Sequence, residues 1–150
     1  MNVSFLRTLI SFLAMWTLVF VLLSFQTLQK EPWSPDQLLN PEDLATTINN
    51  PQNHQPLILC VGPAATIKNS IDIGAAHDKE NLDKLKQKLK TIPKDKVIVL
   101  YCGCCPFNKC PNIRPAFELL NKMKFENHKL LNLPRNLKVD WIDHGYPVNN

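Results

Sequence analysis

The sequence lacks the patterns that mark several common enzyme classes. It has only four glycines among 150 residues, and they form no glycine-rich loop of the kind that binds phosphate groups. It shows neither paired carboxylates placed for acid–base catalysis nor a serine–histidine triad. Its four histidines stand far apart, without the spacing of metal ligands. These absences leave the cysteines as the candidate reactive groups.

A strong excess of one charge is also missing. The 17 basic and 13 acidic residues leave a formal net charge of only +4. The lysines between residues 84 and 90 fit the solvated face of one helix. No aromatic residues alternate with them, as a surface that stacks nucleic-acid bases would require. The sequence therefore predicts no nucleic-acid partner.

One long apolar run stands near the start of the chain. Residues 8–29 carry no charge, and they lie between Arg7 and the pair Lys30 and Glu31. A run of this length can span a bilayer, whereas a cleavable signal peptide has a shorter apolar core of roughly 7–15 residues. We therefore predict an N-terminal hydrophobic helix and favour a membrane anchor through residues 5–29 over a cleaved signal peptide. Residues 1–30 form this signal anchor or signal peptide, and residues 31–150 form one domain.

Either kind of leader sends the rest of the chain across a membrane. Because Arg7 stays on the cytoplasmic side under the positive-inside rule, the domain is expected on the outer side. In a bacterium this is the periplasm, an oxidising compartment in which exposed thiols pair unless they are kept reduced. We expect a membrane-anchored or exported protein on the extracytoplasmic side.

Residues 31–150 alternate between helix and strand signals. Ser34 and Asn40 are helix caps that each precede a proline, and Gly145 can end a last short helix. This alternation predicts an α/β domain with a mostly parallel sheet and helices on both faces. Two longer helices are expected at 78–90 and 113–123, and strands at 56–61, 70–74, 97–101 and 129–133.

Four of the five cysteines lie within nine residues, in the loop between the strand at 97–101 and the helix that begins at Ile113. The carboxyl end of such a strand is where open α/β sheets place their binding and reactive groups. The unpaired N–H groups at a helix start favour negative charge and can lower a thiol pKa. The loop is therefore the candidate site. Its cysteines are Cys102, Cys104, Cys105 and Cys110.

Residues 33–148 resemble the rhodanese-like, or sulfurtransferase, family. The resemblance implies a single rhodanese-like domain that covers nearly all of the chain after the leader. It is carried, in order along the chain, by the segments 58–63, 71–76, 95–102, 114–117 and 141–148.

The resemblance implies that Cys102, which ends the central strand, attacks a sulfur donor such as thiosulfate and becomes a persulfide. The outer sulfur then passes to a thiol acceptor, or a second loop cysteine resolves the persulfide as a disulfide. Arg114 is placed to hold an anionic donor through forked hydrogen bonds. No cofactor is expected. The substrate-binding loop is expected to comprise Gly103, Cys104, Cys105 and Asn112.

Three alternatives stay open at this point. Cys110 competes with Cys102 as the nucleophile, because it lies closer to the helix cap expected at Asn112. A disulfide such as Cys105–Cys110 could instead staple the loop of a non-catalytic binding module. The four loop thiols are also soft ligands suited to Zn²⁺ or Cu⁺. Cys60, outside the loop, is expected to be a core thiol.

Overall fold

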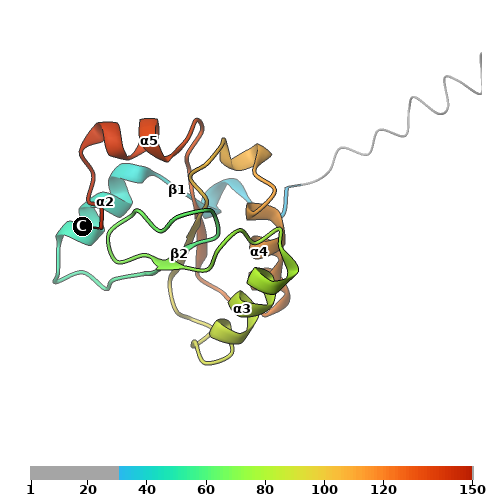
Figure 1. Ribbon diagram of the computed structural model, residues 1–150. Coiled ribbons are helices and arrows are strands. Elements are labelled where there is room, and N and C mark those ends of the chain that lie inside the picture. The colour runs from blue at the N-terminus through green and yellow to red at the C-terminus, as the bar shows by residue number, and fades with distance from the viewer. Residues whose placement is uncertain (1–30, 150) are drawn as a thin grey trace, which may run out of the picture. The chain divides into compact units, whose positions relative to one another are not determined.

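The computed structural model describes residues 31–149, and in this part of the chain five strands form one all-parallel sheet (Figure 1). The prediction of an α/β fold is thereby confirmed. The predicted N-terminal hydrophobic helix falls in residues 1–30, outside the described residues. Within residues 31–149, no helix combines the length and the apolar character needed to cross a membrane.

The strands are Leu38–Leu39 (β1), Leu57–Cys60 (β2), Ile71–Asp72 (β3), Ile98–Tyr101 (β4) and His128–Leu131 (β5). They pair in the order β1-β5-β4-β2-β3. β4 therefore lies in the middle of the sheet, and all four of its residues are buried. Burial on both faces explains why this segment is an unbroken apolar run.

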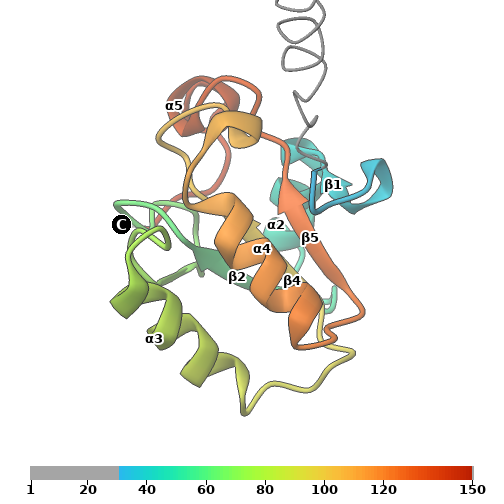
Figure 2. The same ribbon diagram turned by 90° about the vertical axis from the view of Figure 1, so that its right-hand side faces the viewer.

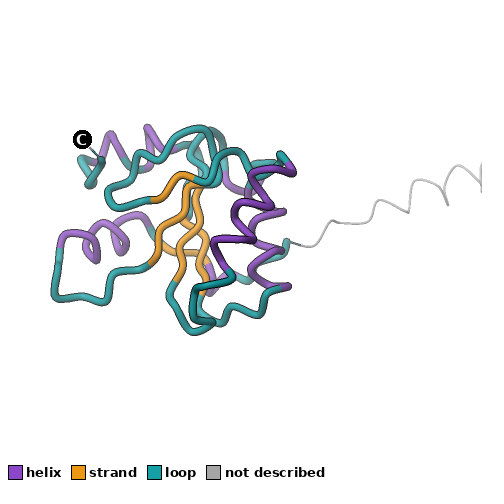
Figure 3. The backbone as a smooth tube through the Cα atoms, turned by 60° about the horizontal axis from the view of Figure 1, so that its bottom comes forward, coloured by secondary structure: helices purple, strands orange, loops and turns teal. Residues whose placement is uncertain are grey.

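Helices cover both faces of the sheet, as the tube view shows (Figure 3). α3 and α4 pack over one face, where Leu85 and Phe117 belong to the same apolar core as Leu100 (Figure 2). α2 and α5 pack over the other face, where Leu44 and Leu137 form a second core. The α-helices are Pro41–Asn49 (α2), Lys79–Leu89 (α3), Ile113–Lys122 (α4) and Leu137–Asp140 (α5). The 3₁₀ helices are Pro35–Gln37 (η1), Phe107–Lys109 (η2) and Ile142–His144 (η3).

The two-residue period of β4 decides which core its side chains enter. Ile98 and Leu100 belong to the core under α3 and α4. Val99 and Tyr101 belong to the core under α2 and α5. Cys102 continues the alternation one residue beyond the strand and joins the core under α3 and α4. The sheet thus delivers this thiol to the start of α4.

The helices and strands predicted from the sequence are present in the structure, which adds β1, η2 and α5. The sequence predicts two short helices in succession after Ser34 and Asn40, and both are present, as η1 and α2. Between them, Leu38 and Leu39 pair with β5. Two residues are too few to show a strand period, so only the neighbouring strand reveals this pairing. The expected end at Gly145 is confirmed, since this residue has a φ of +70° after η3.

Candidate functional site

The cysteine loop is fastened to the segment around α5. The Leu137 N–H donates to the Gly103 carbonyl at 2.9 Å, and the Phe107 N–H donates to the Leu133 carbonyl at 3.2 Å. Gly103 has a φ of +89°, and a Cβ on it would lie 2.9 Å from the Leu137 Cβ. Only glycine fits this turn without strain. The turn brings the side chains of residues 102 and 104 to the same side of the loop.

The loop thiols form a close cluster. The Sγ atom of Cys102 lies 3.2 Å from that of Cys104, which lies 3.3 Å from the Sγ of Cys105. The Sγ atoms of Cys102, Cys104 and Cys110 all lie within 4.8 Å of one another. Cys102 and Cys110 are buried and Cys104 is exposed, so Cys104 faces any molecule that approaches from solvent. All five cysteines are free thiols in the structure.

Hydrogen-bond donors around Cys102 stabilise its thiolate. They lower the pKa of Cys102 to about 5; the Cys110 thiol is the largest cause, and burial opposes the shift. The Cys104 backbone N–H and the Asn112 side-chain amide contribute further, with Asn112 Nδ2 lying 3.4 Å from Cys102 Sγ. A thiolate is the nucleophilic form of cysteine. Cys102 is therefore the loop thiol best prepared to attack.

The neighbouring thiols are held in the protonated form. Burial and hydrogen bonds to Cys102 and Cys105 raise the pKa of Cys104 to about 12. The hydrogen bond to Cys102, together with burial, raises the pKa of Cys110 far above its usual range. Cys110 donates its proton in a hydrogen bond to Cys102. The lowered pKa of Cys102 and the raised pKa of Cys110 therefore favour Cys102 as the nucleophile.

The start of α4 acts on Cys102 in a way the sequence did not indicate. Asn112 stands at the cap position, as predicted, but its side chain makes no capping hydrogen bond. It is buried instead, and its amide faces Cys102. The thiolate is thus held largely by side chains, with the Cys104 N–H as its backbone donor.

Arg114 lies on the first turn of α4, where its Nη2 donates to Glu31 Oε1 at 2.8 Å. Its guanidinium carbon lies 5.4 Å from the centre of the Trp33 ring. The sequence signal of an arginine near the helix start could not reveal these partners, which lie about 80 residues away. Binding of an anionic donor by Arg114 stays a prediction.

Gly62 is a site residue that the sequence analysis did not single out. A Cβ on it would lie 2.4 Å from the Cys102 carbonyl oxygen and 2.7 Å from its Sγ. Atoms do not approach this closely without a backbone shift, so only glycine allows β2 to end beside this sulfur. A glycine directly after the strand predicted at 56–61 is the signal that could have pointed to it.

A soft metal ion has three converging ligands available here. Cys102, Cys104 and Cys110 bring their sulfur atoms together, whereas Cys105 is not part of this group. The remaining cysteine, Cys60, donates to the Ala64 carbonyl at 3.2 Å, and burial raises its pKa. Cys60 is thus a core thiol, as expected.

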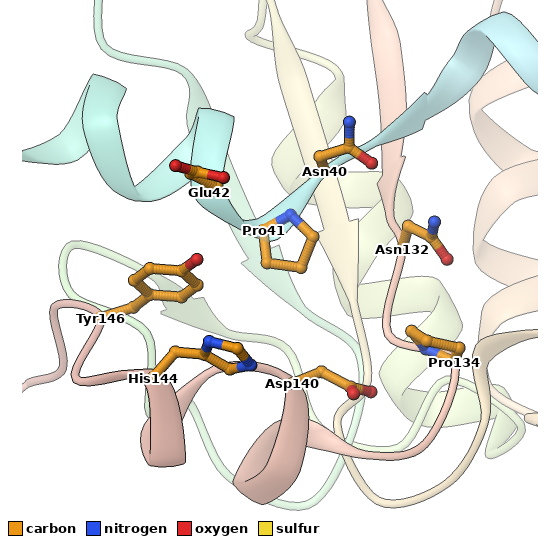
Figure 4. Close-up of a pocket in the computed structure, with 8 residues that line it drawn as sticks. All are labelled: Asn40, Pro41, Glu42, Asn132, Pro134, Asp140, His144 and Tyr146. Carbon is orange, nitrogen blue, oxygen red and sulfur yellow. The ribbon is translucent and has the colours of Figure 1, made fainter.

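A cavity of about 280 Å³ lies at the same edge of the sheet, beyond the ends of β1 and β5 (Figure 4). Asn40 and Asn132 line it from the strand ends, and Glu42, His144 and Tyr146 line it from the neighbouring helices and the C-terminal segment. No cysteine lines it, so this cavity is distinct from the thiol cluster.

Comparison with known proteins assigns no family to this chain: no protein-family model matches it, and neither does any curated protein. A functional assignment therefore depends on the geometry of the thiol cluster.

Proposed function

We propose that residues 31–150 form a rhodanese-like sulfurtransferase domain that carries sulfane sulfur as a persulfide on Cys102. The observation that carries this proposal is the setting of the Cys102 sulfur. It is buried at the carboxyl end of the central strand, among several hydrogen-bond donors and 3.2 Å from a second thiol. These features stabilise a thiolate on Cys102. The sulfur still adjoins Cys104, which is exposed to solvent.

In the first step, the Cys102 thiolate attacks the outer sulfur of thiosulfate. A bond forms between Cys102 Sγ and this sulfur, the bond to the sulfonate sulfur breaks, and sulfite leaves with the bonding electron pair. The negative charge moves to the outer sulfur of the new persulfide. The Cys110 thiol and the Asn112 amide are donors that can stabilise the anion on both sides of this step.

In the second step, an acceptor thiolate attacks the outer sulfur and leaves as a persulfide, which restores the Cys102 thiolate. In the absence of an acceptor, Cys104 is the resolving thiol. The Cys104 sulfur attacks Cys102 Sγ as its proton passes to the negatively charged outer sulfur. A disulfide forms between the two residues, the bond to the outer sulfur breaks, and this sulfur leaves as hydrosulfide with the bonding electron pair. The Sγ–Sγ separation of 3.2 Å supports Cys104 in this role over the other loop cysteines.

The test is the mass of the intact protein after the reduced full chain is incubated with thiosulfate. We expect either the mass of one added sulfur atom or, where Cys104 has resolved the persulfide, the loss of two hydrogen atoms. Both changes are reversed by a thiol reductant and absent in Cys102→Ser. Cys105→Ser is the matched control in the same loop and should take up sulfur normally. An unmodified wild-type mass, or sulfur uptake that persists in Cys102→Ser, contradicts the proposal. If only one thiol reacts in the unreduced, denatured protein, a stapled and non-catalytic loop is favoured instead.

The apolar run near the start of the chain supports a second part of the proposal, which concerns location. We propose that residues 5–29 anchor the chain in a membrane and place the domain on the extracytoplasmic side. A membrane-impermeant maleimide added to intact cells should then label the cysteine loop, which reaches the surface at Cys104. Labelling only after cell lysis contradicts this location.

The convergence of three sulfur atoms favours one further candidate function, the binding of a soft metal ion. Three thiolates suit the trigonal coordination that Cu⁺ accepts, whereas structural Zn²⁺ sites use four protein ligands. Protein purified without chelator should then contain one copper per chain. The metal should be lost in Cys104→Ser but kept in Cys105→Ser. Metal at background levels in the wild type, before and after addition of Cu⁺, removes this candidate.

A further inference from the structure

Asn112 is only 5% exposed, and both ends of its side-chain amide have partners. Its Oδ1 accepts the backbone N–H of His77 at 3.1 Å. A backbone N–H can only donate, so this end of the amide is the oxygen. The NH₂ end therefore faces Cys102 Sγ, which it approaches to 3.4 Å. The orientation of this amide is thus fixed by an unambiguous donor.

The His77 ring adds a second donor to the same oxygen. Its Nδ1 lies 2.6 Å from Asn112 Oδ1, and because this oxygen carries no hydrogen, Nδ1 must carry the proton. On the other side of the ring, Nε2 lies 3.2 Å from Asp78 Oδ1. The His77 side chain is 54% exposed. A line of polar contacts therefore runs from the solvent through His77 and Asn112 to the buried sulfur.

The fold brings these residues together from distant parts of the chain. His77 lies between β3 and α3, and Asn112 lies directly before α4. The Ala76 N–H donates to the Val61 carbonyl at 3.2 Å, which holds the segment before His77 against the end of β2. The two residues are 35 positions apart.

From this geometry we propose that His77 is a positioning residue, which acts through Asn112 to aim an amide N–H at the Cys102 sulfur. A rotation of the amide by half a turn would place its oxygen against the anionic sulfur and its NH₂ against two donors. The His77 ring and backbone oppose that rotation together. The role in sulfur transfer rests on the proposed function, but the aiming of the amide does not.

The test measures how fast Cys102 is alkylated by iodoacetamide in the reduced full chain at about pH 4.5, with the modified peptide identified by mass spectrometry. Because the pKa of Cys102 is about 5, most of this thiol is protonated at that pH, and the rate follows the thiolate fraction. In this reaction, the sulfur forms a bond to the methylene carbon and iodide leaves. Asn112→Leu keeps the shape of the side chain but removes its donor, so access to the sulfur does not increase. We expect its rate of Cys102 alkylation to fall about tenfold, the effect of one hydrogen bond to a charged group.

The paired variants at His77 separate positioning from folding. His77→Ala removes the ring donor but keeps the backbone donor, so we expect a smaller loss of about threefold to fivefold. His77→Asn returns an amide N–H near the place of Nδ1 and should restore the rate to within about twofold of wild type. His54→Ala, at an exposed histidine in a loop, is the control and should leave the rate unchanged. Melting temperatures of all variants show whether they are folded.

Two results overturn the proposal: a folded Asn112→Leu that alkylates as fast as wild type, or a His77→Asn variant that is no faster than His77→Ala. Because alkylation needs no sulfur donor, the experiment is independent of the proposed function. Wild-type protein that alkylates rapidly but takes no sulfur from thiosulfate would refute sulfurtransferase activity and leave the positioning role intact.

Discussion

Two cysteines at the ends of neighbouring strands show how strongly the surroundings change the pKa of a thiol. Cys60 ends β2 and is 0% exposed, while Cys102 follows β4 and is 4% exposed. Burial raises the pKa of Cys60, whereas hydrogen-bond donors lower that of Cys102 to about 5 despite its burial. Burial alone therefore does not decide the state of a thiol. The groups that donate to the sulfur decide it.

The register of the sheet explains the contrast. Cys60 pairs with Tyr101, and both side chains enter the core under α2 and α5. Cys102 lies one residue further along and turns to the other face, toward the start of α4. There the sulfur meets an amide and two thiols. The Cys60 sulfur donates to the Ala64 carbonyl, and the hydrogen bonds that it receives from Gly62 and Tyr101 do not outweigh its burial. A shift by one residue thus separates a core thiol from a candidate nucleophile.

The largest expected difference between the two cysteines is in sulfur uptake from thiosulfate. Cys102→Ser should abolish uptake, because the nucleophile is gone. Cys60→Ala should leave uptake within about twofold of wild type, because its side chain enters the opposite core. Intact mass measures both. Equal loss of uptake in two folded variants would break the comparison.

The next difference is in alkylation near neutral pH. With a pKa of about 5, Cys102 is a thiolate at pH values above about 6, whereas Cys60 stays protonated because its pKa is raised. Site-resolved mass spectrometry should find Cys102 modified at least tenfold faster than Cys60. Cys110→Ala removes the largest cause of the low pKa, so the rise of the Cys102 rate with pH should move to higher pH. A profile unchanged in Cys110→Ala would contradict this assignment.

A smaller effect concerns the backbone that presents Cys102. Gly103 and Gly145 both have positive φ, but a Cβ at Gly103 would contact Leu137 at 2.9 Å, while one at Gly145 would meet nothing within 4 Å. Gly145→Ala should cost about 1 kcal/mol of unfolding free energy from backbone strain alone. Gly103→Ala should cost roughly 2–4 kcal/mol, because steric contact is added to the strain. Urea denaturation measures both, and equal losses would show that the Leu137 contact is easily relieved.

A last effect is on stability as a function of pH. The pKa of Cys102 falls from about 9 to about 5 on folding, so its thiolate stabilises the folded state above about pH 9, and this contribution is lost as the pH falls through about 5. The stability of wild type relative to Cys102→Ser should therefore increase from about pH 5 to about pH 8. Urea midpoints at several pH values test the sign. A difference that decreases over this interval contradicts a lowered pKa.

The sequence was sufficient for features that depend on local pattern. The apolar run at 97–101 predicted β4, the spacing of apolar residues predicted α4, and the loop between them predicted where the thiols gather. The assignment of Cys60 to the core followed from the strand that contains it. These signals are local because strand and helix periods are read over few residues.

The rest depends on contacts between distant segments. Asn112 was predicted as a helix cap, yet its side chain serves Cys102, because His77 arrives from the loop before α3. Arg114 was predicted to hold an anionic donor, and its partner in the structure is Glu31, the first residue of the domain. The spacing of residues in the sequence does not predict these contacts, because each forms only after the strands have paired in their final order. Side-chain partners are accordingly the part of the site that the structure adds.

The closeness of Gly62 to Cys102 limits the dimensions of any reaction partner. Since the space on the β2 side is filled to within atomic contact, a second sulfur atom can extend only toward the rim where Cys104 is exposed. A sulfur donor or acceptor would therefore meet the reacting atom beside Cys104, and not in the interior of the sheet.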